Sequence, residues 1–354
     1  MYGGARQVGY LIAGLARLGV DNVLLCPRGS AIARSGAAAE LVELPLHGDL
    51  DVGQTSRLAR ALRELAPDLL HVHSRRGADL FGGISARRAG LPAVLTRRVE
   101  SAELAPWARF KFRAYARVIA ISTAIHGELI ERFGLDPAAV TLVPSAVDTD
   151  VYRPRTERGR LQQLFALPPD SIVLGNVAQL IPRKGHGTLL RAFARLAAVD
   201  PRIYLICFGR GPLAAALERQ VAGLGLAGRV RFAGFRDDLA ELLPELDILV
   251  HPAEREGLGV AVLEALAAGV PVVGARAGGV PDVIEDGLTG LLAAPGDDAG
   301  FAAAIARVLA DAGLREMLVE QGRCKVVADF SIARMARGNL TVYREVIGDH
   351  GTDG

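Results

Sequence analysis

The sequence predicts an α/β protein with two doubly wound domains that face each other across a cleft. Short β-branched runs alternate with helical segments along the chain, and this alternation predicts parallel sheets covered by helices on both faces. The length of 354 residues agrees with two domains, at about 150 residues per domain. Half of the residues are hydrophobic, as expected for a globular chain with well-filled cores.

Strands are expected in both halves of the chain. In the first half they cover residues 22–26, 40–46, 68–74, 93–98, 117–122 and 140–144. In the second half they cover residues 171–178, 204–209, 230–234, 248–253, 271–275 and 291–293. Helices are expected between them, for example over residues 54–65, 185–199, 213–223 and 259–268.

The strand–helix rhythm also predicts the domain boundaries. It breaks over residues 148–170, where prolines and charges replace the apolar runs. We therefore expect an N-terminal, acceptor-side domain over 1–150, a linker over 151–170 and a C-terminal domain over 171–330. A last helix over 331–350 is expected to pack back toward the N-terminal domain.

The beginning of the chain lacks one element of a complete domain. Gly3 and Gly4 lead at once into a helix whose apolar residues recur at helical spacing from Val8 to Leu18. In a doubly wound sheet the first strand lies at the centre. We therefore expect a gap in the first sheet and a natural start upstream of Met1. The same apolar residues resemble a short signal-peptide core, but the flanking arginines favour an amphipathic surface helix.

Charge and cysteine content exclude several classes of protein. The 41 basic and 39 acidic residues nearly cancel, which argues against nucleic acid as a partner. Cys26, Cys207 and Cys324 are widely separated and form no C-x-x-C, which argues against a disulfide framework or structural zinc. This cysteine usage fits a reducing cytoplasm.

The strongest candidate site runs from His251 to Pro271. A strand ends near Ala253, a loop carries Glu256, and a glycine-rich turn opens a helix that contains Glu264. Free N–H groups at such a helix start suit a pyrophosphate, and carboxylates spaced E-x7-E suit hydroxyls of a sugar and a ribose. The alternative is an ordinary solvated helix with a glycine-rich entry.

A second basic motif follows the first strand of the C-terminal half. Arg183 and Lys184 precede Gly185 at a helix start, where two cations suit the charge of a departing diphosphate. The alternative is a plain surface basic pair.

Further motifs occur in a fixed order with these two. They are Gly3-Gly4-Ala-Arg-Gln, Ile121-Ser122, Val147-Asp148-x-x-x-Tyr152, Arg183-Lys184-Gly185, Phe208-Gly-x-Gly-Pro212, Gly234, Asp247-Ile-Leu-Val-x-Pro252, E-x7-E, Gly278-Gly279-Val-Pro-Asp and Gly287-Leu-Thr-Gly290. Together they resemble the family 4 retaining glycosyltransferases of the GT-B fold, which has two Rossmann-like domains. The resemblance covers nearly the whole chain, and within the family it is to bacterial members that build lipopolysaccharide or other cell-envelope glycans.

The resemblance implies roles for individual residues. Lys184 contacts the donor diphosphate with help from Arg183, Glu256 faces the donor sugar beside the anomeric carbon, and Glu264 binds the ribose. Lys184 and Glu256 are the expected catalytic residues. The backbone around Gly257, Leu258, Gly259 and Val260, with Gly3 and Gly4, holds phosphate and sugar. His73, Arg97 and Arg98 are expected on the acceptor side.

Three positions depart from the family pattern. Gln179 stands where the family often has an arginine, and Leu258 stands where phenylalanine is common. A histidine often follows the threonine of the fourth strand, but here Thr96 is followed by Arg97 and Arg98. Catalysis by a histidine at that place is therefore excluded.

Other patterns imitate functional motifs. Phe208-Gly-Arg-Gly-Pro-Leu-Ala214 follows a strand like a dinucleotide fingerprint, but the next strand lacks the acidic residue that a dehydrogenase needs. Asp148-Thr-Asp150 imitates a D-x-D metal motif but is better explained as a turn. His71 and His73 share a strand face but lack a third ligand, so structural histidines are the better interpretation.

The sequence therefore predicts a retaining, metal-independent glycosyltransferase that needs no cofactor. Its partners are a nucleotide-sugar donor and an anionic glycan or lipid-linked acceptor, and the donor base, the sugar and the acceptor stay open. Because no double-displacement nucleophile is evident, attack on the same face as the leaving diphosphate is preferred. The alternatives are a nucleotide-sugar epimerase and a sugar-nucleotide-binding protein that has lost catalysis.

A basic segment suggests where the protein works. Residues 75–117 carry ten basic and three acidic groups. A helix is expected over 106–117, with Arg109, Arg113 and Arg117 in one stripe and Lys111 interrupting an aromatic face. Such a helix suits the surface of an anionic membrane, and a cytoplasmic enzyme peripheral to the inner membrane is expected. In the alternative the aromatics pack on the sheet and the arginines meet water or a phosphorylated acceptor.

Overall fold

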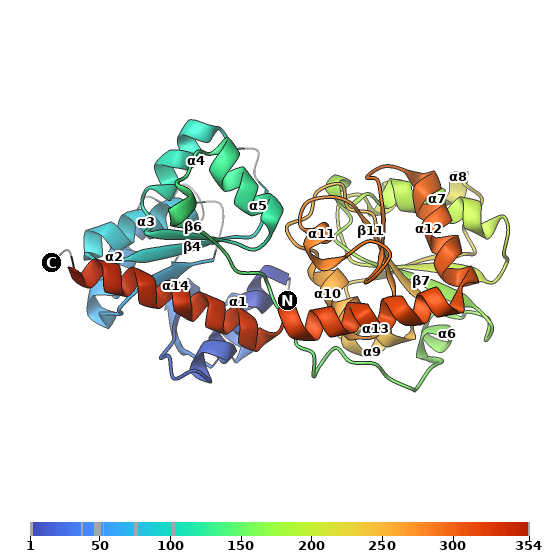
Figure 1. Ribbon diagram of the computed structural model, residues 1–354, viewed down its shortest axis with the longest axis horizontal. Coiled ribbons are helices and arrows are strands. Elements are labelled where there is room, and N and C mark those ends of the chain that lie inside the picture. The colour runs from blue at the N-terminus through green and yellow to red at the C-terminus, as the bar shows by residue number, and fades with distance from the viewer. Residues whose placement is uncertain are drawn as a thin grey trace. The chain divides into compact units, whose positions relative to one another are not determined.

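The computed structural model describes residues 3–36, 38–45, 51, 53–73, 77–100 and 103–352. The chain divides into two compact units (Figure 1). The first unit combines residues 1–146 with 332–354, and the second contains residues 147–331. Each unit has its own parallel sheet flanked by helices, so the α/β class and its Rossmann-like units are confirmed.

The first unit holds two separate parallel sheets among its described residues. The four-stranded sheet has the order β3-β4-β5-β6, and a two-stranded sheet pairs β1 with β2. Strands β1 and β3 share no ladder, in agreement with the expected gap in this domain. The strands are β1 (Val23–Pro27), β2 (Glu40–Leu44), β3 (Leu70–Val72), β4 (Ala93–Arg97), β5 (Arg117–Ala120) and β6 (Val140–Leu142).

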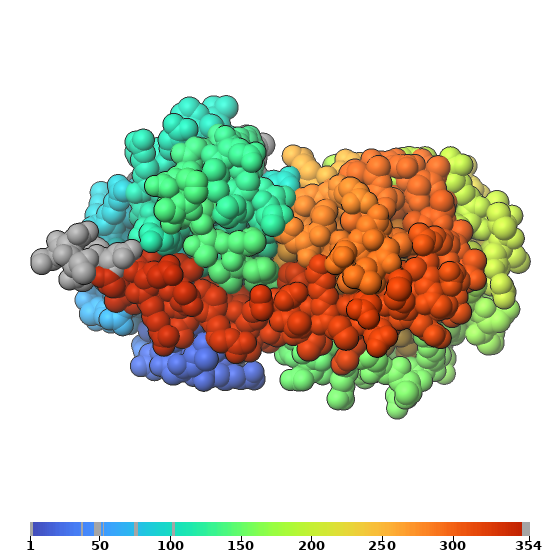
Figure 2. Space-filling model, viewed as in Figure 1, coloured from blue at the N-terminus to red at the C-terminus, as the bar shows by residue number. Residues whose placement is uncertain are grey.

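Helices from both ends of the chain complete the first unit. Leu11 and Leu15 of α1 (Gly3–Ala16) share a core with Met335 and Val346 of α14 (Ile332–Thr352). Figure 2 shows α14 in red at the surface of this unit. The remaining helices are α2 (Gln54–Leu65), α3 (Ala78–Ala89), α4 (Ala105–Phe112) and α5 (Thr123–Gly127).

The second unit holds one six-stranded parallel sheet in the order β12-β11-β10-β7-β8-β9. The chain starts at β7 (Ile172–Val177), builds β8 (Ile203–Phe208) and β9 (Val230–Gly234) on one side, and then returns to the other. There it builds β10 (Ile248–His251), β11 (Val272–Ala275) and β12 (Leu291–Ala293). The order therefore reverses between β7 and β10, and in doubly wound sheets ligands bind outside the carboxyl ends of the strands at such a reversal.

Helices on the second sheet enclose a large apolar core. Leu189 and Phe193 of α7 and Phe301 of α12 are fully buried against the strands. The helices of this unit are α6 (Arg160–Phe165), α7 (His186–Ala197), α8 (Ala214–Gly223), α9 (Leu239–Leu242), α10 (Val260–Ala267), α11 (Val280–Val283), α12 (Asp298–Ala310) and α13 (Ala312–Asp329).

Each of the expected strands occurs, and most ends agree within two or three residues. Residues 46 and 74, at the ends of two expected strands, lie outside the described residues. The structure differs from the expectation over 151–170, which belongs to the second unit instead of lying between the units. There Glu245 Oε2 accepts hydrogen bonds from the N–H groups of Gly159 (2.9 Å) and Leu161 (3.1 Å).

The expected basic helix is also shorter than predicted. Helix α4 ends at Phe112, because the chain turns at Arg113 and Ala114 and then enters β5 with Arg117. The predicted three-arginine helical stripe is therefore wrong, and only Arg109 and Arg113 are related by a helical turn.

Candidate active site

The site of the second unit lies at the reversal between β7 and β10. The segment after β7 carries Arg183 and Lys184 into α7, and the segment after β10 carries Glu256 into α10. Parallel strands place both segments at the same edge of the sheet, so residues 72 positions apart meet. The strand order therefore brings together the two motifs identified in the sequence, the basic pair Arg183-Lys184 and the loop that carries Glu256.

Glu256 is the centre of this cluster. Its Oε2 accepts hydrogen bonds from Lys184 Nζ and from His251 Nε2, the latter at 2.9 Å. Its Oε1 accepts from the backbone N–H of Gly257 at 3.0 Å. Burial raises the pKa of this carboxyl, but the hydrogen bond from His251 and the charge of Lys184 outweigh burial and hold it well below its usual range. The carboxylate is therefore ionised at neutral pH.

Two glycines permit the close approach of the loops around Glu256. Gly185 has φ +68°, and a Cβ there would lie 2.0 Å from the carbonyl oxygen of Pro252. Gly278 has φ +53°, and a Cβ there would lie 1.9 Å from the carbonyl oxygen of Glu256. Because both contacts are with backbone, neither can be relieved by moving a side chain, and any larger residue would displace the loop.

The glycine-rich turn leads into α10 as expected. Gly259 is the N-cap of α10 with φ +94°, and Leu263 N–H bonds back to Gly259 O at 3.1 Å. Gly257 and Leu258 are buried beside it, and Val260 begins the helix. The N–H groups of the first turn precede the intrahelical ladder and are suited to an anion. Glu264 follows one turn later and is buried.

Two further buried polar residues border the cluster. His186 opens α7, is 3% exposed, and both of its ring nitrogens lack a hydrogen-bond partner. Burial and the neighbouring Lys184 and His251 lower its pKa to about 4. Asn176 donates to Val250 O at 2.9 Å across the sheet, while its Oδ1 lacks a partner. Arg183 lies at the edge of the cluster, where its Nη1 donates to Arg255 O at 3.1 Å.

The expected acceptor-side residues follow the strands of the first unit, and His73 and Arg98 meet there. Arg98 Nη2 lies 3.4 Å from His73 Nδ1, and Arg98 Nη1 donates to Ser145 Oγ at 3.0 Å. The His71 and His73 rings lie 3.7 Å apart between centroids. His71 is held by the hydroxyls of Thr96, at 2.7 Å, and Tyr343.

Arg97, although adjacent to Arg98, belongs to a different group. It is buried beside Asp79 and Glu103, with closest N–O distances of 3.8 and 3.5 Å. Lys111 Nζ joins the same carboxylates at 2.7 and 2.6 Å. Lys111 therefore does not interrupt the exposed face of α4, as the sequence suggested, because its side chain points into the protein. We name Asp79, Arg97, Glu103 and Lys111 the buried ion cluster.

Two further motifs from the sequence lie at the start of α1 and at Asp148. Gly3 and Gly4 lie in the first turn of α1, where they are exposed. Asp148 Oδ1 accepts from the N–H groups of Asp150 (3.1 Å) and Val151 (3.2 Å), which makes this motif a turn. Among the residues that the structure describes, no three His, Cys, Asp or Glu side chains form a possible metal cluster. None of the described helices is long and apolar enough to cross a membrane.

Sequence reasoning assigned no role to His251, His186 or Gly278. His251 and His186 stood inside the two motifs that drew attention, and Gly278 stood in a Gly-Gly pair. Their positions in the motifs were therefore a usable signal. Their contacts were not visible in the sequence, because His251 meets Glu256 through the fold of the loop after β10 and Gly278 approaches Glu256 from a separate loop.

The fold and this site define a GT-B protein of the glycosyltransferase class. The family model for glycosyl transferases group 1 matches residues 158–325, and that for glycosyltransferase family 4 matches residues 1–151. This chain belongs to that glycosyltransferase family, so the predicted resemblance is confirmed.

Curated relatives agree with this assignment. D-inositol 3-phosphate glycosyltransferase of Salinispora arenicola is 32% identical over 80% of this chain and 70% of that protein. The protein of the same name from Salinispora tropica is also 32% identical, and the chain spans 65% of its length. The lipopolysaccharide core biosynthesis glycosyltransferase LpsE of Rhizobium meliloti is 40% identical over 46% of this chain and 47% of its own.

Solved structures show the same fold. A glycosyltransferase of Rickettsia africae has a TM-score of 0.85 at 18% identity and covers 97% of this chain and 94% of its own. Anabaena Alr3699/HepE, solved in complex with UDP and glucose, has a TM-score of 0.83 at 21% identity, over 97% and 96%.

Proposed function

We propose that this protein is a retaining, metal-independent glycosyltransferase that moves a sugar from a nucleotide-sugar donor to an acceptor hydroxyl. The observation that carries the proposal is the ionised Glu256 beside Lys184 at the strand reversal, next to the free amides of α10. The acceptor is an envelope glycan or lipid-linked molecule, in line with the relative named for lipopolysaccharide core biosynthesis.

Each residue of the cluster has a part in the proposed reaction. Lys184, with Arg183 and the amides at the start of α10, stabilises the negative charge that develops on the leaving diphosphate, a task often given to a metal ion. Glu256 faces the donor sugar, and Glu264 binds the ribose. The acceptor oxygen forms its bond to the anomeric carbon on the face from which the diphosphate departs. A phosphate oxygen of the leaving group takes the acceptor proton.

The proposal is tested by replacing Glu256. Glu256→Ala should lower turnover at least about 100-fold while nucleotide affinity changes only a few-fold, because electrostatic stabilisation acts mainly on the transition state. Glu254→Ala is the matched control, since Glu254 is exposed two positions away. Equal turnover of the Glu256→Ala and Glu254→Ala variants would refute the assignment.

The choice of donor and the alternatives are tested together. UDP-glucose is the first donor to try, because HepE binds UDP and glucose, and a thermal-shift screen extends the search to other nucleotides. A change of donor configuration without acceptor indicates an epimerase. Donor binding with neither transfer nor slow donor hydrolysis indicates a binding protein. Retention is checked from the anomeric configuration of the product by NMR.

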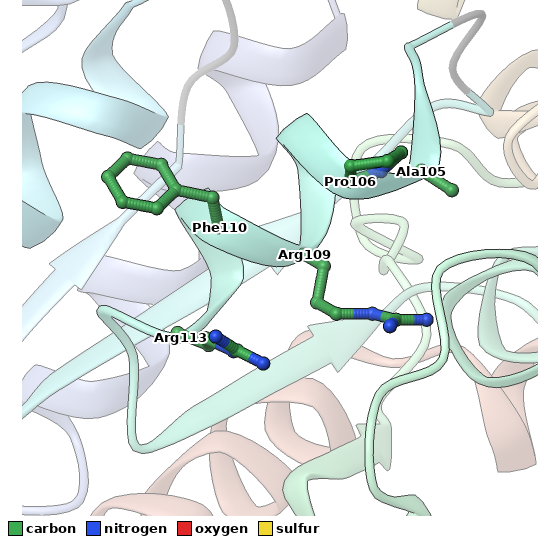
Figure 3. A pocket seen from close by; sticks show the side chains of 5 residues that line it. All are labelled: Ala105, Pro106, Arg109, Phe110 and Arg113. Atoms are coloured by element: carbon green, nitrogen blue, oxygen red, sulfur yellow. The ribbon is translucent and has the colours of Figure 1, made fainter.

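We also propose that the protein works at the cytoplasmic face of the inner membrane, through one face of α4. Leu104, Trp107 and Phe110 recur every third residue there and are 78%, 48% and 59% exposed. The rings of Trp107 and Phe110 stack at 5.7 Å. An open hollow beside them is lined by Arg109 and Arg113, which leave the helix on a side away from Phe110 (Figure 3).

The charge around this face favours an anionic bilayer as its partner. Arg87 and Arg88 of α3 and Arg109 and Arg113 beside them form no ion pair with a described carboxylate. Two of the three acidic side chains in residues 75–117, Asp79 and Glu103, are already paired inside the buried ion cluster. Exposed apolar rings flanked by unpaired cations are the pattern of an interfacial helix, with about 1 kcal/mol for each basic group near the surface.

Trp107, the only tryptophan of the chain, provides the assay. Anionic phosphatidylglycerol vesicles should shift its emission to the blue and pellet the protein at low salt, whereas phosphatidylcholine vesicles should not. Leu104→Ser with Phe110→Ser should weaken pelleting at least about tenfold, since each buried apolar side chain contributes about 1.5–3 kcal/mol. Leu164→Ser with Val199→Ser, which changes exposed apolar residues of the second unit, is the control. No pelleting at low salt, or self-association through this face, would contradict the proposal.

A further inference from the structure

The first unit contains a partly buried cation that nothing in the described structure neutralises. Arg98 lies just after β4, and its Nε is buried without a hydrogen-bond partner. It makes no ion pair with a carboxylate among the described residues, in contrast to the adjacent Arg97. Withdrawing a charge even partly from water without an opposite charge beside it is costly, so its place at the end of a strand calls for a functional explanation.

The side chains that contact Arg98 offer further hydrogen-bond donors beside its guanidinium group. His73 Nδ1 accepts from Arg98 Nη2, which leaves the proton of the neutral ring on Nε2 as a donor. Ser145 Oγ accepts from Arg98 Nη1, so its hydroxyl hydrogen is available. Each terminal nitrogen of the guanidinium also keeps a second N–H. We name Arg98, His73 and Ser145 the Arg98 site.

The surroundings hold these donors in place without adding charge. Burial first, and the charge of Arg98 second, lower the pKa of His71 to about 3, so it is neutral. Its ring lies against His73, with both nitrogens occupied by the hydroxyls of Thr96 and Tyr343. Gln7 of α1 fixes the backbone beside Ser145 through two hydrogen bonds to Ala146, at 2.6 and 2.8 Å.

We propose that the Arg98 site binds an anionic group, a phosphate or a carboxylate, carried by the acceptor. An arginine fork matches two oxygens of either group, and His73 and Ser145 supply further hydrogen bonds. The site lies at the carboxyl ends of β3, β4 and β6, the edge at which doubly wound sheets bind ligands. The inference rests on the proposed function and sharpens it, because it makes the acceptor an anionic one and assigns its recognition to Arg98 and not to Arg97.

Binding is measured on the full chain with inorganic phosphate and acetate as probes. The protein is labelled with ¹³C-histidine, and its seven histidines are assigned by single replacements. Addition of phosphate or acetate should shift the NMR signal of His73 until the site is saturated. The anion that saturates the shift at the lower concentration is the preferred one. Anions that bind near Lys184 should move His186 or His251 instead, so the two sites are read separately.

The variants separate charge from geometry. Arg98→Gln should weaken the His73 response at least about tenfold, and Arg98→Lys should weaken it only a few-fold, because lysine keeps the charge but loses the fork. Arg63→Gln, an exposed arginine of the same unit, should leave it unchanged. A His73 signal that neither probe moves in the wild type, or an equal response in Arg98→Gln, overturns the inference.

A separate assay distinguishes failure of this inference from failure of the proposed function. Slow hydrolysis of a nucleotide sugar without acceptor tests the donor site alone. Hydrolysis of the nucleotide sugar without a His73 response contradicts anion binding at the Arg98 site but remains consistent with the proposed transferase. A His73 response in a protein that neither hydrolyses the donor nor transfers its sugar supports the anion site and contradicts the proposed transferase.

Discussion

The Glu256 cluster of the second unit and the Arg98 site of the first treat buried charge in opposite ways. Glu256 is compensated by Lys184, His251 and a backbone N–H, so its charge is stable before any donor arrives. Among the described residues, Arg98 has only neutral hydrogen-bond partners, His73 and Ser145. A charge that is paired within the protein, such as that of Glu256, can stabilise the fold and also act on a substrate. A charge without an opposite charge beside it, such as that of Arg98, lowers stability, and we infer that the protein keeps it because it binds a ligand.

Removing the partner of Glu256 should produce the largest loss of stability. Lys184→Met leaves the carboxylate without its cation, with only hydrogen bonds from His251 and the N–H of Gly257, and should lower the free energy of unfolding of the second unit by about 3 kcal/mol. Thiol labelling of Cys207 measures this, because burial raises the pKa of its thiol to about 12 and it reacts only after the unit opens. Lys325→Met is a control, and equal effects of the two would show that the ion pair contributes nothing.

The neighbours Arg97 and Arg98 should respond differently to the same substitution. Arg97→Met removes one of the two cations that face Asp79 and Glu103 in the buried ion cluster and should lower the free energy of unfolding by about 2–3 kcal/mol. Arg98→Met removes a partly buried charge that no described carboxylate pairs, so the unfolding free energy should stay the same or rise. Denaturant unfolding followed by Trp107 fluorescence reports on this unit. A loss of stability in Arg98→Met as large as in Arg97→Met would contradict the statement that only the charge of Arg97 stabilises the fold.

Acid should destabilise the first unit through its two neighbouring histidines, His71 and His73. Burial lowers the pKa of His71 to about 3 and that of His73 well below its usual range. Both therefore bind fewer protons in the folded protein than in the unfolded chain, so the free energy of unfolding falls as the pH drops below about 6.5.

Between pH 6.5 and pH 5 each histidine should contribute a loss of about 2 kcal/mol. Trp107-monitored unfolding at several pH values measures this slope, and His71→Gln should reduce it, whereas Arg63→Gln should not. A slope that is the same in His71→Gln would show that this histidine is protonated as readily in the folded as in the unfolded chain.

The elements of the fold were predictable because their signals are local. Buried parallel strands appear as short β-branched runs, and helices appear through apolar spacing, so even β9 and α2 were located with their observed ends. Segment 151–170 was interpreted wrongly because its prolines and charges resemble a linker. Contacts with residues far along the chain attach it to the second unit, such as the hydrogen bonds to Glu245 and the ion pair of Arg160 with Asp238.

The candidate site was predictable only in part. Glu256, Lys184 and the turn into α10 stood out because glycines and charged residues cluster at the ends of expected strands. The bond from His251 to Glu256 was not visible because it depends on how the loop after β10 folds back toward the strand end. The approach of Gly278 was not visible because it depends on how two separate loops converge.

By itself the sequence determined the two Rossmann-like units, the family and the residues at the strand reversal. The tertiary structure decided which charges are compensated. Arg97 and Arg98 are adjacent and chemically identical, yet Arg97 joins carboxylates while Arg98 faces His73 and Ser145. The reason is physical: adjacent residues at a strand end point to different neighbours, and those neighbours come from distant parts of the chain, as with Lys111 and Asp79, 32 positions apart.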